Sequence, residues 1–197
     1  SMAMPLVIGG PMIWFLLLKH EQLRHANNQL AHLASTDWLT GCLSRGAFTE
    51  AVTRRLEQRR GAVTGGALLI VDADDFKSVN DRFGHDAGDE ALRLIARAIG
   101  RAVGDSDLVG RLGGEEFGVL LAHSGARAAD HVAERIRAAV AAIDFAPGGT
   151  PCPLSVSIGG TTYATSVAFG DLYRIADRHL YEAKNSGRDR VAMMQAA

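Results

Sequence analysis

Two glutamates directly follow two glycines in the stretch GRLGGEEFGVLL, residues 110–121. Gly113-Gly114 is a strong signal for a two-residue hairpin turn, because glycine readily adopts the positive φ angles that such turns require. The turn explains the glycines but not Glu115 and Glu116, since neighbouring carboxylates repel each other unless a cation lies close to both. The pattern therefore predicts a hairpin tip that takes part in chemistry.

A second acidic group, Asp72, Asp74 and Asp75, follows the apolar run GGALLIV. If this run is a strand, Asp72 and Asp74 face the same side of it. Carboxylates from a strand end and from a hairpin tip offer the hard oxygen ligands that Mg²⁺ prefers, and Mg²⁺ commonly binds substrate phosphates as well. The two acidic groups predict a metal site, and a solvated acidic rim at the strand ends is the alternative.

Basic and amide side chains accompany the acidic groups. Lys77, Asn80 and Asp89 follow the first group along the chain. Lysine supplies a point charge for a phosphate, while Asn and Asp carry the donor and acceptor atoms that can read a guanine edge. Lys184 and Arg188 are spaced by four at the end of a helical pattern, which places them on one side of it. Each is an ordinary surface residue alone, but together they indicate a site for a metal-bound polyphosphate.

The elements that must position these residues indicate an α+β fold. Helical patterns cover residues 44–60, 86–103, 126–143 and 169–187, and strand patterns cover residues 65–74, 108–112, 117–122, 152–163 and 189–194. A hairpin pairs two of the strands, and helices separate the others. This order predicts a sandwich with a central mixed, largely antiparallel sheet flanked by helices.

The signature of the hairpin and five further blocks resemble the GGDEF family of diguanylate cyclases, here in its GGEEF form. The resemblance covers residues from about 37 to 193, and its other blocks are DWLTGCLSR, VDADDFKSVND, GHDAGDEAL, SVSIGG and LYEAKNSGR. Cys42 and Ser44 depart from the family's opening element. The resemblance implies the palm-like sheet of class III nucleotidyl cyclases. It also implies that two GTP molecules condense to cyclic di-GMP and two pyrophosphates, in a homodimer whose facing domains each hold one GTP.

The resemblance also implies a role for each matched residue. Asp72, Glu115 and the backbone carbonyl of Ala73 would bind Mg²⁺, with Mn²⁺ as a possible substitute, and Glu116 would lie beside the metal and the nucleotide. The resemblance implies that the catalytic residues are Asp72, Lys77, Glu115 and Glu116. The implied nucleotide contacts are Asn80 and Asp89 to the guanine, Lys77, Lys184 and Arg188 to the phosphates, and Gly113 and Gly114 to the close-lying nucleotide.

The family's product-inhibition motif, RxxD, is incomplete in this chain. Its arginine should stand nine residues before the first signature glycine, where this chain has Gly104 in the stretch GDSD, whereas its aspartate is present as Asp107. An arginine can bind a guanine edge or a phosphate through two contacts, which glycine cannot do. We therefore expect weak or absent product inhibition, with Arg101, Arg111 and Arg135 as candidate replacements.

The N-terminal segment, residues 1–18, contains an uncharged apolar stretch over residues 2–18. A complete membrane span needs roughly 20 apolar residues. The stretch predicts the end of a transmembrane helix, and Lys19 and Arg24 directly after it suit a cytoplasmic exit. We therefore expect a protein of the bacterial inner membrane whose catalytic domain lies in the cytoplasm. The alternative is an apolar segment packed on the domain or on a partner.

Residues 19–36 have the pattern of a linker helix before the catalytic domain, which covers residues 37–197. Leu16, Leu23 and Leu30 are spaced by seven. This spacing predicts a short coiled coil, and Asn27 at a companion core position is a known device for fixing a parallel dimer. An amphipathic linker helix against its own domain is the alternative.

Composition narrows the class of protein. Hydrophobic residues make up 47% of the chain and charged residues 22%, as in globular proteins with a core. The net charge of −1 provides no general attraction to nucleic acid, so we expect no nucleic-acid partner. Cys42 and Cys152 have no metal-ligand spacing, which predicts two inert thiols in a reducing compartment.

Three other functions compete with cyclase activity. The first is a catalytically silent module that binds GTP or cyclic di-GMP, and the second is a purely structural dimerisation domain. The third is a cyclase that makes a different cyclic dinucleotide. The presence of all the implied metal, phosphate and guanine residues favours a guanine-specific enzyme over each of them.

Overall fold

A computed structural model describes residues 14, 19, 35–58, 65–122, 124–165 and 167–193. The chain divides into two compact units, Ser1–Ser35 and Thr36–Ala197. Apart from residue 14, the predicted membrane segment lies outside the described residues, and so does nearly all of the predicted linker helix. Among the residues that are described, no helix is both long and apolar enough to cross a membrane.

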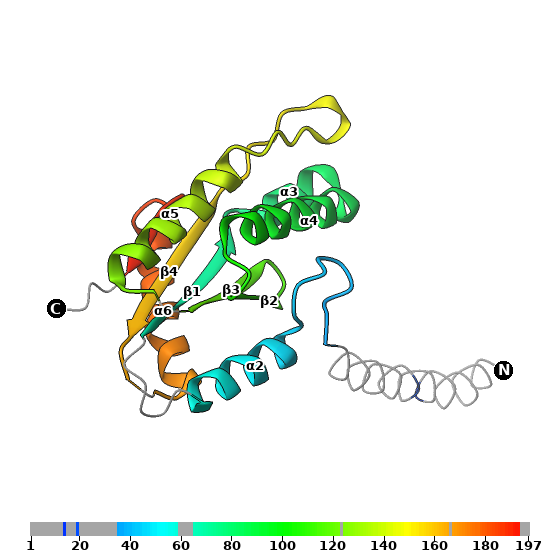
Figure 1. Cartoon of the computed structure of the whole chain (residues 1–197). Coiled ribbons are helices and arrows are strands. Elements are labelled where there is room, and N and C mark those ends of the chain that lie inside the picture. The colour runs from blue at the N-terminus through cyan, green and yellow to red at the C-terminus, as the bar shows by residue number, and fades with distance from the viewer. Residues whose placement is uncertain are drawn as a thin grey trace. The chain divides into compact units, whose positions relative to one another are not determined.

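The second unit is built on one five-stranded sheet (Figure 1). Its strands are β1 (Gly66–Ala73), β2 (Leu108–Gly113), β3 (Glu116–Ala122), β4 (Val156–Tyr163) and β5 (Val191–Met193), in the spatial order β2-β3-β1-β4-β5. Neighbouring strands are antiparallel except β4 and β5, which are parallel. The prediction of a mixed, largely antiparallel sheet is confirmed.

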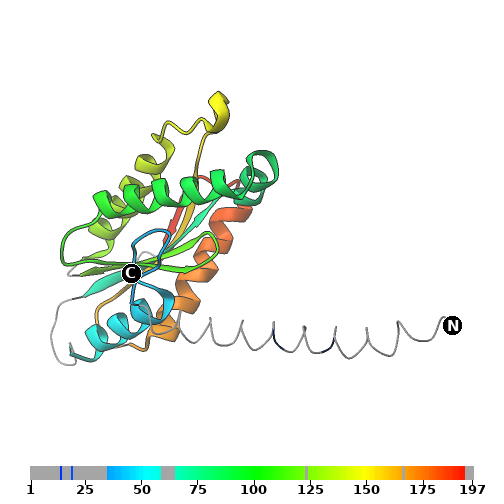
Figure 2. The same ribbon diagram turned by 90° about the vertical axis from the view of Figure 1, so that its right-hand side faces the viewer.

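Helices cover both faces of this sheet (Figures 1 and 2). The helices are α2 (Arg45–Gln58), α3 (Phe76–Phe83), α4 (His85–Ala102), α5 (Ala126–Ala141) and α6 (Phe169–Asn185), with a short 3₁₀ turn at Pro147–Gly149. Side chains of α2 and α6 share a core with Leu68 and Ile70 of β1, whereas those of α4 and α5 share a core with Leu69 and Val71. Side chains alternate along a strand, so β1 contributes to both cores and is buried throughout.

Two local predictions are corrected. The sequence patterns left residues 76–83 without an element, but these residues form α3, which ends at Gly84 with φ of 83° before α4 begins. The hairpin turn consists of Gly114 and Glu115 rather than Gly113-Gly114. A bulge in β2 before Gly113 shifts the register, so Gly113 pairs with Glu116 and the turn moves forward by one residue.

Candidate active site

The register of the sheet places the two acidic groups next to each other. Asp72 at the end of β1 lies opposite Glu116 of β3, and the Ala73 amide donates a hydrogen bond to the Glu115 carbonyl, 3.2 Å away. Directly opposite residues of an antiparallel pair project their side chains from the same face. The strand end and the hairpin tip therefore form one acidic cluster, which consists of Asp72, Glu115 and Glu116.

A lysine of α6 balances part of this negative charge. The Lys184 Nζ lies 2.9 Å from the Asp72 Oδ2, and Asp72 is only 9% exposed. Burial raises the pKa of Asp72, Lys184 acts to lower it, and the charges of Glu115 and Glu116 raise it further. The result is a raised pKa, because a buried carboxylate beside two others is fully stabilised only by additional positive charge.

The close approach of α6 to the sheet depends on a glycine of the SVSIGG block. A Cβ built on Gly159 of β4 would lie 2.1 Å from the Leu180 amide nitrogen and 2.2 Å from the Ala176 carbonyl oxygen of α6. Any larger residue at position 159 would push α6 away from the sheet. Because Lys184 lies one turn after Leu180, this glycine sets the helix position that lets Lys184 reach Asp72.

Asp74 serves a different purpose from Asp72. Its Oδ1 accepts a hydrogen bond from the Ser157 hydroxyl at 2.6 Å, and its Oδ2 accepts from the Ser155 hydroxyl at 2.8 Å and the Asp189 amide at 3.0 Å. Both oxygens are therefore used to fasten the end of β1 to β4 and to the loop after α6. The sequence alone did not distinguish this structural aspartate from the acids of the cluster.

The chemistry of the cluster suits a hard dication. Asp72, Glu115 and the Ala73 carbonyl would provide only oxygen ligands. Burial, together with the charges of Glu115 and Glu116, raises the pKa of Asp72, and a bound cation would stabilise its charged form. The part of the chain that the structure describes holds no ready group of three or more acidic, histidine or cysteine side chains arranged for a metal. The metal assignment of these residues therefore stays a prediction.

The residues that the family resemblance assigns to guanine lie on α3 and α4. A Cβ on Gly88 would lie 2.0 Å from the Asn80 Oδ1, so the Asn80 side chain packs directly on α4 beside the residue before Asp89. This contact requires glycine at position 88, which the GHDAGDEAL block supplies. The fold thus brings Asn80 close to the start of α4. Recognition of guanine by Asn80 and Asp89 stays a prediction.

The implied phosphate-binding residues surround the start of α3. Lys77 is exposed on the first turn of this helix. The Arg188 Nε lies 3.4 Å from the Asp75 Oδ1. Asp75 and Arg188 both have left-handed backbones, with φ of 50° and 59°. Such conformations are unfavourable for residues other than glycine, so the surrounding structure holds both ends of this ion pair in place.

Residues 34–190 match the family described as diguanylate cyclase, GGDEF domain. This chain belongs to the GGDEF family. The match covers the hairpin, the acidic cluster, α3, α4 and Lys184, so the resemblance stated from the sequence is confirmed.

Relatives in the GGDEF family share a third or more of their residues with this chain over the matched region. Diguanylate cyclase DgcP of Pseudomonas aeruginosa is 40% identical over 160 residues, which are 80% of this chain and 24% of the relative. Diguanylate cyclase DgcM of Escherichia coli strain K12 is 36% identical over 189 residues, 95% of this chain and 45% of the relative. The chain therefore spans less than half the length of these curated relatives.

Solved GGDEF structures have the same fold. The coiled coil and GGDEF domain of DgcB from Caulobacter crescentus, in complex with c-di-GMP, aligns with a TM-score of 0.78 at 28% identity, covering 94% of this chain and 98% of that chain. The active GGEEF domain of a diguanylate cyclase from Vibrio cholerae aligns with a TM-score of 0.65 at 32% identity, covering 76% of this chain and 93% of that chain. These likenesses confirm the predicted fold class.

The remaining aspartate of the GGDEF inhibition motif, Asp107, binds backbone amides of its own domain. The two carboxylate oxygens of Asp107 accept hydrogen bonds from the amides of Gly104 and Ala122, both at 2.8 Å. The aspartate therefore has a local structural role at the start of β2. Gly104 has no side chain with which to contact a ligand.

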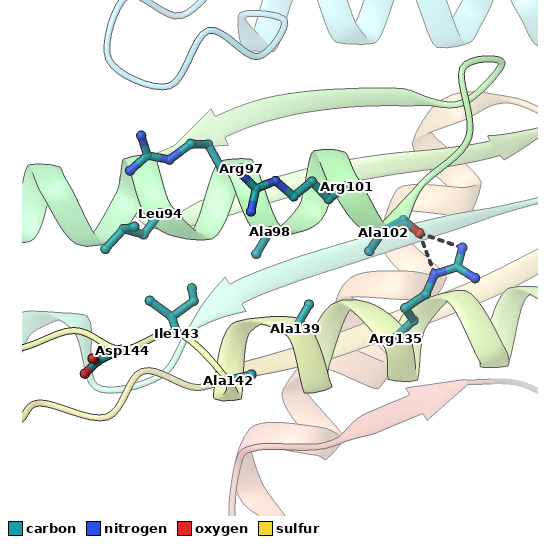
Figure 3. Close-up of a pocket in the computed structure, with 10 residues that line it drawn as sticks. All are labelled: Leu94, Arg97, Ala98, Arg101, Ala102, Arg135, Ala139, Ala142, Ile143 and Asp144. Carbon is teal, nitrogen blue, oxygen red and sulfur yellow. Dashed lines mark hydrogen bonds between the residues drawn. The ribbon is translucent and has the colours of Figure 1, made fainter.

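Two of the three candidate replacement arginines are engaged elsewhere. Arg111 donates hydrogen bonds to the Gly114 carbonyl in the hairpin turn. Arg135 of α5 donates two hydrogen bonds, of 3.0 and 2.7 Å, to the Ala102 carbonyl (Figure 3). Arg101 has no partner among the described residues and lines a cavity of about 480 Å³ between α4 and α5 (Figure 3). Arg101 is therefore the replacement that the structure leaves most available.

Sequence reasoning missed an arginine that holds the GGEEF turn. The Arg111 Nε and a terminal nitrogen donate hydrogen bonds of 3.0 and 2.7 Å to the Gly114 carbonyl, and the other terminal nitrogen lies 3.2 Å from Asp37. Asp37 also accepts from the Thr40 amide and hydroxyl at 2.9 and 2.6 Å. Through Arg111, the DWLT block is connected to the turn that carries Glu115. The aspartate of that block, Asp37, was the one feature of the sequence that could have indicated this contact.

We expect Asp37→Asn to lower the free energy of unfolding at pH 7 by about 1–3 kcal/mol, because a mostly buried charge-assisted hydrogen bond is lost. Burial acts to raise the pKa of Asp37, but Thr40 and Arg111 outweigh it, so the pKa is lowered from 3.8. A lowered folded-state pKa adds stability above pH 3.8 that disappears as the pH falls through the folded value.

Urea unfolding at pH 7 and at pH 3 measures this effect. The difference between wild type and Asp37→Asn should be present at pH 7 and shrink at pH 3, which lies below the ordinary pKa of 3.8 that the carboxyl has in the unfolded chain. Asp130→Asn, at an exposed position of α5, is the matched control and should change little at either pH. An equal difference at both values would contradict the assigned role of the charge.

Proposed function

We propose that this chain is a diguanylate cyclase that joins two GTP molecules into cyclic di-GMP and releases two pyrophosphates. The observation that carries the proposal is the juxtaposition of Asp72 with Glu115, Glu116 and Lys184 at one end of the sheet. Membership of the GGDEF family supports the same activity, and the relatives named above are diguanylate cyclases.

Phosphoryl transfer of this kind depends mainly on positioning and on neutralising charge. Asp72, Glu115 and the Ala73 carbonyl would hold Mg²⁺, or Mn²⁺ in its place. When bound, the dication would supply charge neutralisation at the phosphates and activation of the attacking hydroxyl. The glycine pair would allow the hairpin backbone to approach the nucleotide, because a Cβ is absent there.

The basic residues would orient the triphosphate, and the amide and acid of α3 and α4 would orient the base. Lys77 comes from the start of α3, whereas Lys184 and Arg188 come from the end of α6 and the loop after it, so two separate segments would supply positive charge to the phosphates. Asn80 and Asp89 would bind the guanine edge through donor and acceptor atoms. Lys184 would move from its contact with Asp72 when phosphate and metal are bound.

The reaction requires two copies of the chain. The 3′-hydroxyl of one GTP must attack the α-phosphorus of the other in line, and each domain would hold only one GTP. We therefore infer an active homodimer, assembled through the N-terminal helix. We further infer that residues 1–18 attach the protein to the bacterial inner membrane, with the catalytic domain in the cytoplasm. No nucleic-acid partner is proposed.

Incubation of the protein with labelled GTP and Mg²⁺, followed by separation and mass analysis of the products, tests this function. Cyclic di-GMP formed from GTP alone is the expected result. Bound but unchanged GTP would instead indicate a silent binding module, and absence of both binding and turnover would indicate a structural domain. A mixed product formed when other nucleotides are added would indicate a different cyclase.

We expect product inhibition to be at least tenfold weaker than an intact RxxD site would provide. Loss of one charge-assisted arginine contact costs roughly 1.5–3 kcal/mol, or about 10- to 100-fold in affinity. The measurement is calorimetric titration of cyclic di-GMP into the Glu115→Ala variant, with and without Asp107→Ala. Tight binding that Asp107→Ala abolishes would contradict the prediction. Binding that Arg101→Ala abolishes would instead identify Arg101 as the replacement.

A further inference from the structure

Glu116 is held by a tyrosine to which the family resemblance assigned no role. The Tyr173 hydroxyl of α6 donates a hydrogen bond to the Glu116 Oε1, with 2.8 Å between the oxygens. The other carboxylate oxygen of Glu116 has no hydrogen-bond partner among the described residues. One oxygen of this signature carboxylate is therefore fixed, and the other is left available.

The Tyr173 ring is itself fixed by aromatic packing. Its centroid lies 6.0 Å from that of Phe169, one turn earlier on α6, and the Phe169 ring meets Phe48 of α2 edge-on at 6.3 Å. Such aromatic contacts favour particular ring arrangements. The hydroxyl that contacts Glu116 is thus positioned by the core between α2 and α6 rather than by a flexible surface side chain.

Helix α6 separates two like charges. Asp72 and Glu116 lie directly opposite each other on neighbouring strands, where their carboxylates repel. Lys184 near the end of α6 binds Asp72, and Tyr173 near its beginning binds Glu116. Tyr173 and Lys184 are separated by about 16 Å along the helix axis, at 1.5 Å per residue. Each acid therefore bonds to a different part of α6.

We propose that Tyr173 is a positioning residue for GTP condensation, which holds the Glu116 carboxylate apart from Asp72 and fixes its orientation toward the bound nucleotide and metal. This inference rests on the proposed function. Burial and the Glu116 carboxylate raise the pKa of Tyr173 to about 12, so the phenol remains a donor throughout the physiological range. The geometry of the contact, rather than any change of protonation, carries the proposal.

Tyr173→Phe removes the hydroxyl and retains the ring. We expect kcat to fall by at least tenfold, because a hydrogen bond to a charged group is lost, while the KM for GTP changes much less. The matched control is Tyr181→Phe on the same helix, whose side chain is 67% exposed, and it should retain the wild-type kcat. Wild-type kcat in Tyr173→Phe, with turnover intact in the control, would overturn the proposal.

A second measurement does not depend on turnover. Subtracting the ultraviolet titration of Tyr173→Phe from that of the wild type isolates the ionisation of the Tyr173 phenol. Glu116→Gln should move this ionisation to lower pH, because the acceptor loses its charge, and an unmoved titration would overturn the contact. If the wild type forms no product, the proposed function fails, and this titration still decides whether Tyr173 holds Glu116.

Discussion

Glu115→Ala is expected to lower the rate of cyclic di-GMP formation by about 100-fold or more. The substitution removes a carboxylate that we propose as a ligand of the metal, and such a ligand contributes several kcal/mol of charge stabilisation in the transition state. The fold should survive, because Glu115 lies in the hairpin turn and only its backbone carbonyl bonds to β1. The measurement is the initial rate of product formation at saturating GTP and Mg²⁺, together with the melting temperature.

Asp72→Ala should produce a loss of similar size. Asp72 is buried next to two other carboxylates, and its pKa is raised. Because its charge is only partly compensated, its loss should change the melting temperature of the metal-free protein little. Glu57→Ala, at an exposed position of α2, serves as the control and should retain full activity. Near-normal turnover in either site variant, at an unchanged melting temperature, would refute the assignment.

Removal of residues 1–35 is expected to make specific activity strongly dependent on protein concentration. The remaining unit, Thr36–Ala197, is compact by itself, so the domain should stay folded. Without the helix that we propose for dimerisation, two half-sites meet only by chance encounter. Below the dissociation constant the dimer fraction is proportional to concentration, so a tenfold dilution should lower specific activity by about tenfold.

Product formation per milligram of protein, measured across a dilution series for the full chain and for the shortened chain, tests this expectation. Sedimentation of both chains at the same concentrations reports the fraction of dimer. The full chain should show a much weaker dependence over the same range. A shortened chain whose specific activity does not change on dilution would show that the N-terminal helix is unnecessary for assembly.

Local patterns in the sequence were sufficient to predict most elements. The apolar residues of α4 recur with the period of a helix, and the apolar residues of β1 are continuous, as in a strand buried on both faces. Both patterns can be recognised within the segment alone. The same reasoning missed α3, because its eight residues contain only one buried side chain, Val79. It also misplaced the hairpin turn, since a bulge in β2 depends on how two strands pair and leaves no clear local signal.

The motifs were sufficient to identify the family, the fold class and the residues to consider, because motif residues keep their order and spacing along the chain. What each of these residues contacts could be learned only from the folded structure. Asp72 and Asp74 are indistinguishable as sequence, yet one binds Lys184 and the other binds two serines, one just before β4 and one within it. The Tyr173–Glu116 contact likewise joins segments far apart in the chain. Periodicity shows which face of its own element a side chain occupies, but the partner across that face depends on how distant elements pack.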